Sequence, residues 1–166
     1  MITYSIFDKI YLKEISAEEF KILSNYHENL QAFEQTLESL VKNLSKEKKK
    51  KAENITKIFC KPARSFGLYD GEKYIGYLSF SNYESATPEI QIDIHEPYQR
   101  KGIGYKGVSF LTAELFRERE DIEYFIYRVR IENVASRKLI EKLGGEEMST
   151  DAMVAKFIKK IRITRK

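Results

Sequence analysis

Residues 89–104 decide the fold of this chain, and they read EIQIDIHEPYQRKGIG. The first seven alternate between isoleucine and polar residues, which is typical of a strand with one packed face and one polar face. After the two glycines, apolar residues recur at helical intervals up to residue 116. We therefore expect a strand over 89–95, a loop, and a helix over 102–116, with the polar face of the strand able to line a cleft.

The loop between this strand and this helix is either a pyrophosphate site or a plain strand-to-helix turn that uses glycine for its geometry. Backbone N–H groups in a loop, followed by the N-terminus of a helix, bind phosphate groups well. Glycines at 102 and 104 would let the main chain approach ligand oxygens closely, and two basic residues precede them. The predicted phosphate-binding residues are Gln99, Arg100, Lys101, Gly102, Ile103, Gly104 and Tyr105.

The same glycines also match the G-x-G-x-x-G pattern of dinucleotide-binding folds, from Gly102 to Gly107, with Asp121 near the expected distance beyond. In those folds the first glycine follows its strand almost immediately, within a repeated strand-helix-strand unit. Here six residues separate His95 from Gly102, so we expect no nicotinamide or flavin site.

Working outward, the pattern predicts a mixed α/β (α+β) architecture. Toward the C-terminus we expect a strand over 123–131, a helix over 135–143 that ends at Gly144 and Gly145, and a final strand pair near 146–149 and 154–161. Toward the N-terminus we expect a hairpin of 65–69 and 73–82 around a turn at 70–71, a short strand near 10–12, and helices from residue 17 to about 61. Ser16 and Glu19 form a capping box for the first of these helices.

Length and composition set the outer limits. A chain of 166 residues fits one domain, 1–166, and no apolar stretch approaches the roughly 18 residues of a membrane span. The N-terminus has no export signal, so we expect a cytoplasmic protein without a membrane partner. Cys60, His27 and His95 are too few and too scattered for a metal site, and we predict none.

The net charge of +4 comes from interspersed charges except for the run Lys46 to Lys51. Such a run could bind nucleic acid or an acidic partner, or be a solvated helix end. No aromatic or arginine residues interleave it, so we favour the solvated surface and expect no nucleic-acid partner.

The string Gln99-x-x-Gly102-x-Gly104, after a strand and a Pro-Tyr turn, resembles the Q/R-x-x-G-x-G/A signature of the GNAT acetyltransferases. A second string just after a later strand, Asn133-x-x-Ser136-x-x-Leu139, resembles the segment of that family that flanks the coenzyme A arm. The resemblance implies the GNAT acyl-CoA N-acyltransferase fold, a mixed and mostly antiparallel sheet flanked by helices and splayed between the strands at 89–95 and 123–131. It also implies acetyl-CoA as co-substrate and acetyl transfer to a primary amine.

The resemblance assigns further roles. The pantetheine arm would pair with the main chain of Ile92, Asp93 and Ile94, and Asn133 and Ser136 would contact the coenzyme. Glu89 matches a frequent position for the general base, with Asp93 as an alternative.

A departure from the family concerns the general acid. A tyrosine often follows the position of Leu139 and protonates the leaving thiolate, but here that residue is Ile140. Ser136, Tyr124 and Tyr127 remain as donors, and we include Ser136 and Tyr127 with Glu89 among the catalytic residues. In lacking this tyrosine the chain resembles the ribosomal-protein N-acetyltransferase branch of the family, whose members often lack it as well. A second departure is Gly145, where an aromatic usually stands.

Three questions stay open at this level. The acceptor could be a protein N-terminus, a polyamine, an aminoglycoside or a small metabolite. The loss of the tyrosine also allows a module that binds coenzyme A without catalysis, and the lysine run allows a nucleic-acid-associated protein. Dimers are common in the family, so a homodimer is an open expectation.

Overall fold

The computed structural model describes residues 2–23, 45–46, 62–150, 152, 154–156 and 158–166. The expected helices after residue 23, and all but the first residue of the lysine run, lie outside the described residues. Within the described part, no helix is long and apolar enough to cross a membrane.

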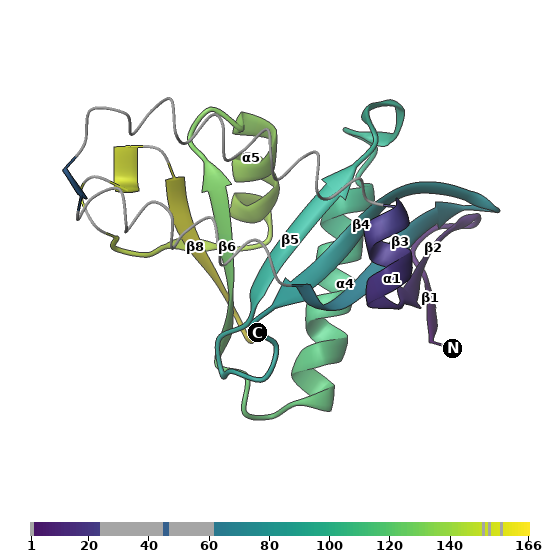
Figure 1. The fold of residues 1–166 in the computed structure, drawn as a ribbon, viewed down its shortest axis with the longest axis horizontal. Helices are drawn as coiled ribbons and strands as arrows, with labels where there is room; N and C mark the ends of the chain where they lie inside the picture. Colours follow the sequence, from purple (N-terminus) through teal and green to yellow (C-terminus); the bar gives the residue numbers. More distant parts are fainter. Residues whose placement is uncertain (1, 24–44, 47–61, 151, 153, 157) are drawn as a thin grey trace.

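Eight strands of the described chain form one sheet in the order β1-β2-β3-β4-β5-β6-β8-β7 (Figure 1). Every neighbouring pair is antiparallel except β5 and β6, which are parallel. This confirms the mixed, mostly antiparallel sheet. The strands are β1 (Thr3–Ser5), β2 (Ile10–Ile15), β3 (Pro62–Asp70), β4 (Lys73–Ser81), β5 (Glu89–Ile94), β6 (Tyr124–Arg130), β7 (Glu146–Glu147) and β8 (Ile158–Thr164).

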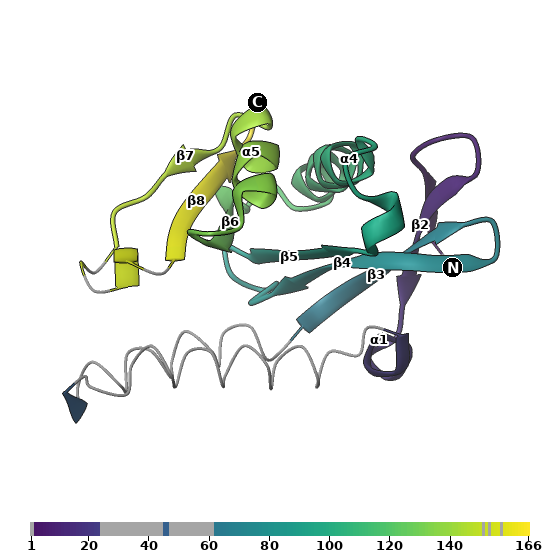
Figure 2. The ribbon, with the colours of Figure 1, turned by 90° about the horizontal axis from the view of Figure 1, so that it is seen from above.

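Helices cover both faces of the sheet (Figure 2). Helices α4 (Ile103–Glu118) and α5 (Val134–Lys142) lie on one face, and α1 (Ala17–Leu23) lies on the other. The main core forms between the sheet and α4 and α5, and it includes Leu111, Phe125 and Ile140. The predicted capping box of α1 is confirmed, because Ser16 N donates to Glu19 Oε2 at 2.8 Å and Glu19 N donates to Ser16 Oγ at 3.1 Å.

Two expectations about the chain ends need correction. The first strand, Thr3–Ser5, was not expected, because three residues are too short to show a period in the sequence. Near the C-terminus, residues 154–156 form a 3₁₀ turn and not the start of a strand, and β8 begins only at residue 158. Beyond that point β8 follows β6 along its whole length.

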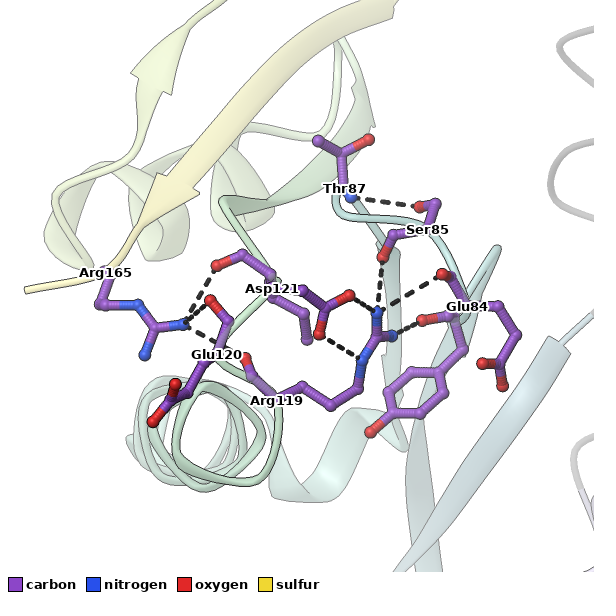
Figure 3. A network of polar contacts seen from close by, with 9 residues as sticks. Glu84, Ser85, Thr87, Arg119, Glu120, Asp121 and Arg165 are labelled. Carbon is purple, nitrogen blue, oxygen red and sulfur yellow. Dashed lines mark hydrogen bonds and ion pairs between the residues drawn. The ribbon is translucent and has the colours of Figure 1, made fainter.

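Two arginines fix the far end of α4 (Figure 3). Arg119 donates to the carbonyl oxygens of Tyr83, Glu84 and Ser85 and pairs with Asp121. Arg165 donates to four carbonyl oxygens at the end of α4 and just after it, those of Phe116, Arg119, Glu120 and Ile122. Unpaired carbonyl groups at a helix C-terminus favour cationic donors. These contacts hold the C-terminal end of α4 against the β4–β5 connection and against the last residues of the chain.

Strands β4 and β5 approach each other unusually closely at Gly76. This residue has φ +152° and pairs with Ile94, and a Cβ added there would lie 2.2 Å from the carbonyl oxygen of Asp93. Only glycine allows this approach, because both the backbone angle and the space exclude a side chain.

We expect Gly76→Ala to lower the free energy of unfolding by about 3 kcal/mol or more, since a main-chain oxygen cannot move aside without separating the strands. The matched control is Gly71→Ala in the neighbouring turn, where φ is +58° but nothing lies within 4 Å of the added Cβ. That variant should lose only about 1 kcal/mol from backbone strain. Urea denaturation of both measures the difference, and equal losses would contradict the steric argument.

Candidate active site

The sheet opens between β5 and β6. These strands pair only through Glu89 with Ile126 and Ile90 with Tyr127, whereas β4 continues to pair with β5 as far as Ile94. Beyond the two paired positions β5 and β6 diverge, as Figure 1 shows. The predicted splay is therefore confirmed, and we call the divergent part of the two strands the fork.

The two faces of β5 carry different chemistry. Ile92 and Ile94 lie under α4, where their Cδ1 atoms are within 3.4 Å of the position of a Cβ on Gly104. Asp93 faces the α1 side, opposite Tyr77 of β4. The side chains of Ile92 and Ile94 thus pack against the helix, and only their main chain can serve a ligand.

Asp93 lies where β5 borders the fork, and its side chain is partly buried. Among the described residues it forms no ion pair. Burial raises the pKa of its carboxyl group, and the charge of His95 opposes that shift. A half-buried carboxylate with little compensation is well suited to accept a proton or to hold an ammonium group.

Tyr127 and Ser136 come together at the other side of the fork. Tyr127 of β6 shares a side-chain hydrogen bond with Ser136 in the first turn of α5. Burial raises the pKa of Tyr127, the hydrogen bond with Ser136 opposes the rise, and the charge of Asp93 adds to it. The phenol therefore stays protonated at neutral pH. Tyr124, the third donor expected from the sequence, lies an odd number of residues away on the same strand and so faces the opposite side.

Glu89 has a different environment from Asp93. Its carboxylate accepts three hydrogen bonds from the Arg128 guanidinium, at 2.9, 3.0 and 3.2 Å. The side chains of Glu89 and Arg128 are only 7% and 12% exposed. Both carboxylate oxygens are thus engaged in a nearly buried ion pair, which makes Glu89 a weaker candidate for the base than Asp93.

The phosphate loop ends in a helix N-terminus without a side-chain cap. Gly102 is the N-cap of α4 with φ +77°, and Arg100 also has a positive φ of 60°. The first intrahelical bond is donated by Lys106, so the N–H groups of Ile103, Gly104 and Tyr105 have no partner within the helix. Such a terminus is suited to an anion.

The two glycines of the loop have different roles. Gly102 provides the left-handed backbone angle, since a Cβ there would meet nothing within 4 Å. At Gly104 a Cβ would lie 2.7 Å from Leu139 Cδ1, so this glycine lets α4 pack against α5 and β5. For Gly104 the missing side chain thus has a packing role that the sequence did not show, and the approach of its main chain to a ligand stays a prediction.

Side chains around the loop hold it and add charge. Gln99 Nε2 donates to the Ile94 carbonyl oxygen at 2.8 Å, and Tyr98 Oη donates to Asp70 Oδ2 at 3.2 Å. The ammonium groups of Lys101 and Lys73 lie 5.5 and 5.3 Å from the centre of the Tyr98 ring. This clustering of positive charge beside a bare helix N-terminus strengthens the case for an anion site.

The side chains of the second motif, which begins at Asn133, mostly serve the local structure. The Asn133 side chain caps α5, because its Oδ1 accepts from Ser136 N at 3.1 Å. Ile140 is fully buried in the main core. A Cβ on Gly145 would lie 2.6 Å from Ile140 Cγ2 and 2.7 Å from Ile161 Cγ2, so the two departures from the family pattern fit each other.

Some residues near the fork were not predicted. The sequence around each of these residues does not show which residue of another strand or turn it contacts. They are Tyr77, Arg128, Lys73 and Tyr98. Tyr74 adds a buried hydroxyl group that has no hydrogen-bond partner among the described residues. Also within this part, no three histidine, cysteine or acidic side chains lie close enough to hold a metal ion.

Comparison with known proteins gives a consistent picture. A family model described as an acetyltransferase (GNAT) domain matches residues 11–146. No curated protein sequence matches the chain. Among solved structures, the ribosomal-protein-S5-alanine acetyltransferase from Vibrio fischeri is similar with a TM-score of 0.65 and 16% identity, covering 99% of this chain and 97% of that one.

Two further structures share the fold. Spermidine N-acetyltransferase from Vibrio cholerae, in complex with CoA and spermine, has a TM-score of 0.61 and 18% identity over 95% of this chain and 96% of its own. An acetyltransferase from Salmonella typhimurium that modifies the N-terminal serine of a 50S ribosomal subunit protein has a TM-score of 0.64 and 17% identity over 99% and 100%.

The raised pKa of Asp93 predicts a stabilising substitution. Because the folded-state pKa lies above the ordinary value of an aspartate, the contribution of this group to stability is fully present below that ordinary value and is lost as the pH rises through the folded-state pKa. Asp93→Asn should therefore raise the urea midpoint at pH 7, with a gain that shrinks toward pH 4.

A matched control is Asp121→Asn, since the hydrogen bond from Arg119 lowers the pKa of Asp121. That variant should instead lose stability at pH 7. If Asp93→Asn is the less stable protein at pH 7, the carboxylate has a stabilising partner and the sign is wrong.

Proposed function

The chain belongs to the GNAT acetyltransferases, and on that premise we propose that it transfers the acetyl group of acetyl-CoA to a primary amine. The observation that carries the proposal is the fork between β5 and β6, with the bare N-terminus of α4 at one end and proton-exchanging side chains on both sides. This arrangement offers the three things that the reaction requires: a place for the thioester, an anchor for the diphosphate, and groups that accept and donate protons.

The donor would bind along β5 and the phosphate loop. The pyrophosphate would lie against the N–H groups of residues 102–105, with Gln99, Arg100 and Lys101 beside it. The pantetheine arm would run along the main chain of Ile92, Asp93 and Ile94, in the place that β6 leaves. Asn133 and Ser136 would contact it from α5.

Asp93 is our preferred general base, directly or through water, and Glu89 is the second candidate. Asp93 borders the fork and has a raised pKa, whereas both oxygens of Glu89 are engaged by Arg128. Removing a proton from the amine lets its lone pair attack the thioester carbonyl. Main-chain N–H groups in the fork would stabilise the oxyanion that forms.

Tyr127 is our candidate for the general acid, with Ser136 orienting it. When the tetrahedral intermediate collapses, the sulfur leaves as a thiolate, and a protonated phenol can supply its proton. A proton donor is less critical for a sulfur leaving group than for an oxygen leaving group, because thiols have pKa values near 8.5.

Amines of low pKa are the acceptors that suit this site best. At pH 7 roughly a tenth of α-amino groups are neutral, against well under a thousandth of lysine side chains, so an α-amine needs little help from a carboxylate. The similar structures include enzymes named for ribosomal-protein N-termini and for spermidine, and we favour a protein N-terminus.

An acetyl-CoA consumption assay across peptide N-termini, polyamines, aminoglycosides and small amines tests the function. We expect turnover with at least one peptide N-terminus, and acetyl-CoA binding measured by calorimetry. Tight binding without turnover on any amine would favour the coenzyme A-binding module instead.

Tyr127→Phe should lower kcat about 100-fold at pH 7 while leaving the Kd for acetyl-CoA unchanged, because it removes only the proton donor. Because burial raises the Tyr127 pKa, the wild type should lose kcat from ionisation of this group only at a higher pH than an exposed tyrosine would require. Tyr124→Phe, on the opposite side of β6, is the control and should keep wild-type kcat. Equal kcat for both variants would remove Tyr127 from the mechanism.

A further inference from the structure

The fork starts at a defined point. The N–H of Ile126 donates to the Pro88 carbonyl oxygen at 2.8 Å, and the last paired residues are Ile90 and Tyr127. Arg128 is the next residue of β6, the first beyond the paired part. Its side chain reaches back across the seam to Glu89, the first residue of β5.

The Glu89–Arg128 contact is stronger than a surface ion pair. The guanidinium presents both Nε and Nη2 to the carboxylate, which is the rigid two-pronged geometry that fixes direction as well as distance. Both side chains are nearly buried, so solvent screens the pair little. Losing one partner would leave a buried charge uncompensated.

We propose that the Glu89–Arg128 ion pair is a strut that sets the angle at which β5 and β6 separate, with Arg128 as a positioning residue for the acetyl transfer. This inference rests on the proposed function, since the separated strands hold the thioester. Tyr127 precedes Arg128 directly, so the strut also fixes the proposed acid relative to Asp93. A displacement of about 1 Å in such a site can lower the rate about 100-fold.

A double-mutant cycle distinguishes a structural role of Glu89 in the ion pair from a role as general base. The variants are Glu89→Met, Arg128→Met and the two combined, because methionine is uncharged and unbranched, matches the length of glutamate and keeps part of the apolar stem of arginine. Arg130→Met is the matched control, because Arg130 is on the same strand face and its ion pair with Glu132 is exposed. For each protein kcat, KM for acetyl-CoA, and Tm are measured.

If the pair is a strut, each single variant loses kcat by 10-fold to 100-fold, raises KM for acetyl-CoA, and has a lowered Tm. The double variant, which leaves no buried charge, should recover kcat to within about 5-fold of the wild type and most of the Tm. Arg130→Met should match the wild type. A folded double variant that stays as inactive as Glu89→Met overturns the proposal and returns Glu89 to the role of base.

Glu89→Gln gives a second test that does not depend on the folding of the double variant. Without a base, the rate should rise about 10-fold per pH unit below the amine pKa, because only the neutral amine reacts. With a lost strut, the pH profile should keep the wild-type shape at a lower level. The steeper profile would overturn the proposal.

The proposal about the strut can be tested even if the proposed function is wrong. If the wild type acetylates no amine, the Kd for acetyl-CoA and the Tm of the same four proteins still form a complete cycle. Recovery of both quantities in the double variant supports the strut even then, and additive losses in both overturn it.

Discussion

The structure depends on a parallel seam between β5 and β6 that stops after two paired positions. On one side, β5 stays paired with β4 as far as Ile94, and on the other β6 is paired with β8 along its whole length. Each half of the sheet is therefore well connected, and the two halves separate only at the seam. Because main-chain groups in a sheet need partners, this early end of pairing creates a place for an extended ligand.

The phosphate end of that place is held by packing as much as by loop geometry. Gly104 brings the first turn of α4 against Ile92, Ile94 and Leu139, so the helix N-terminus is fixed directly beside β5. Arg119 and Arg165 hold the other end of the same helix. A ligand that bridges the helix N-terminus and the strand thus meets two preorganised surfaces, which lowers the entropy lost on binding.

Periodicity predicted most of the elements around the site, because β5, α4, β6 and α5 each have a face packed on the main core. The splay came from the family resemblance carried by Gln99 and Asn133, and not from periodicity. Neither periodicity nor the resemblance predicted the contacts between side chains of different elements. Glu89 and Arg128 are 39 residues apart, and nothing local in either strand shows that they meet. The same holds for Gly104, whose missing side chain leaves space for Leu139.

Glu89 and Asp93 show why chemistry could not be assigned from spacing alone. They are four residues apart on one strand, so they share a face, and the sequence offers no reason to separate them. The difference comes from β6. At Glu89 the strands are still paired, and Arg128 can reach the carboxylate. At Asp93 the strands have diverged, and burial raises the pKa of its carboxyl group against the opposing charge of His95. The seam that opens the site also gives the two carboxylates different surroundings.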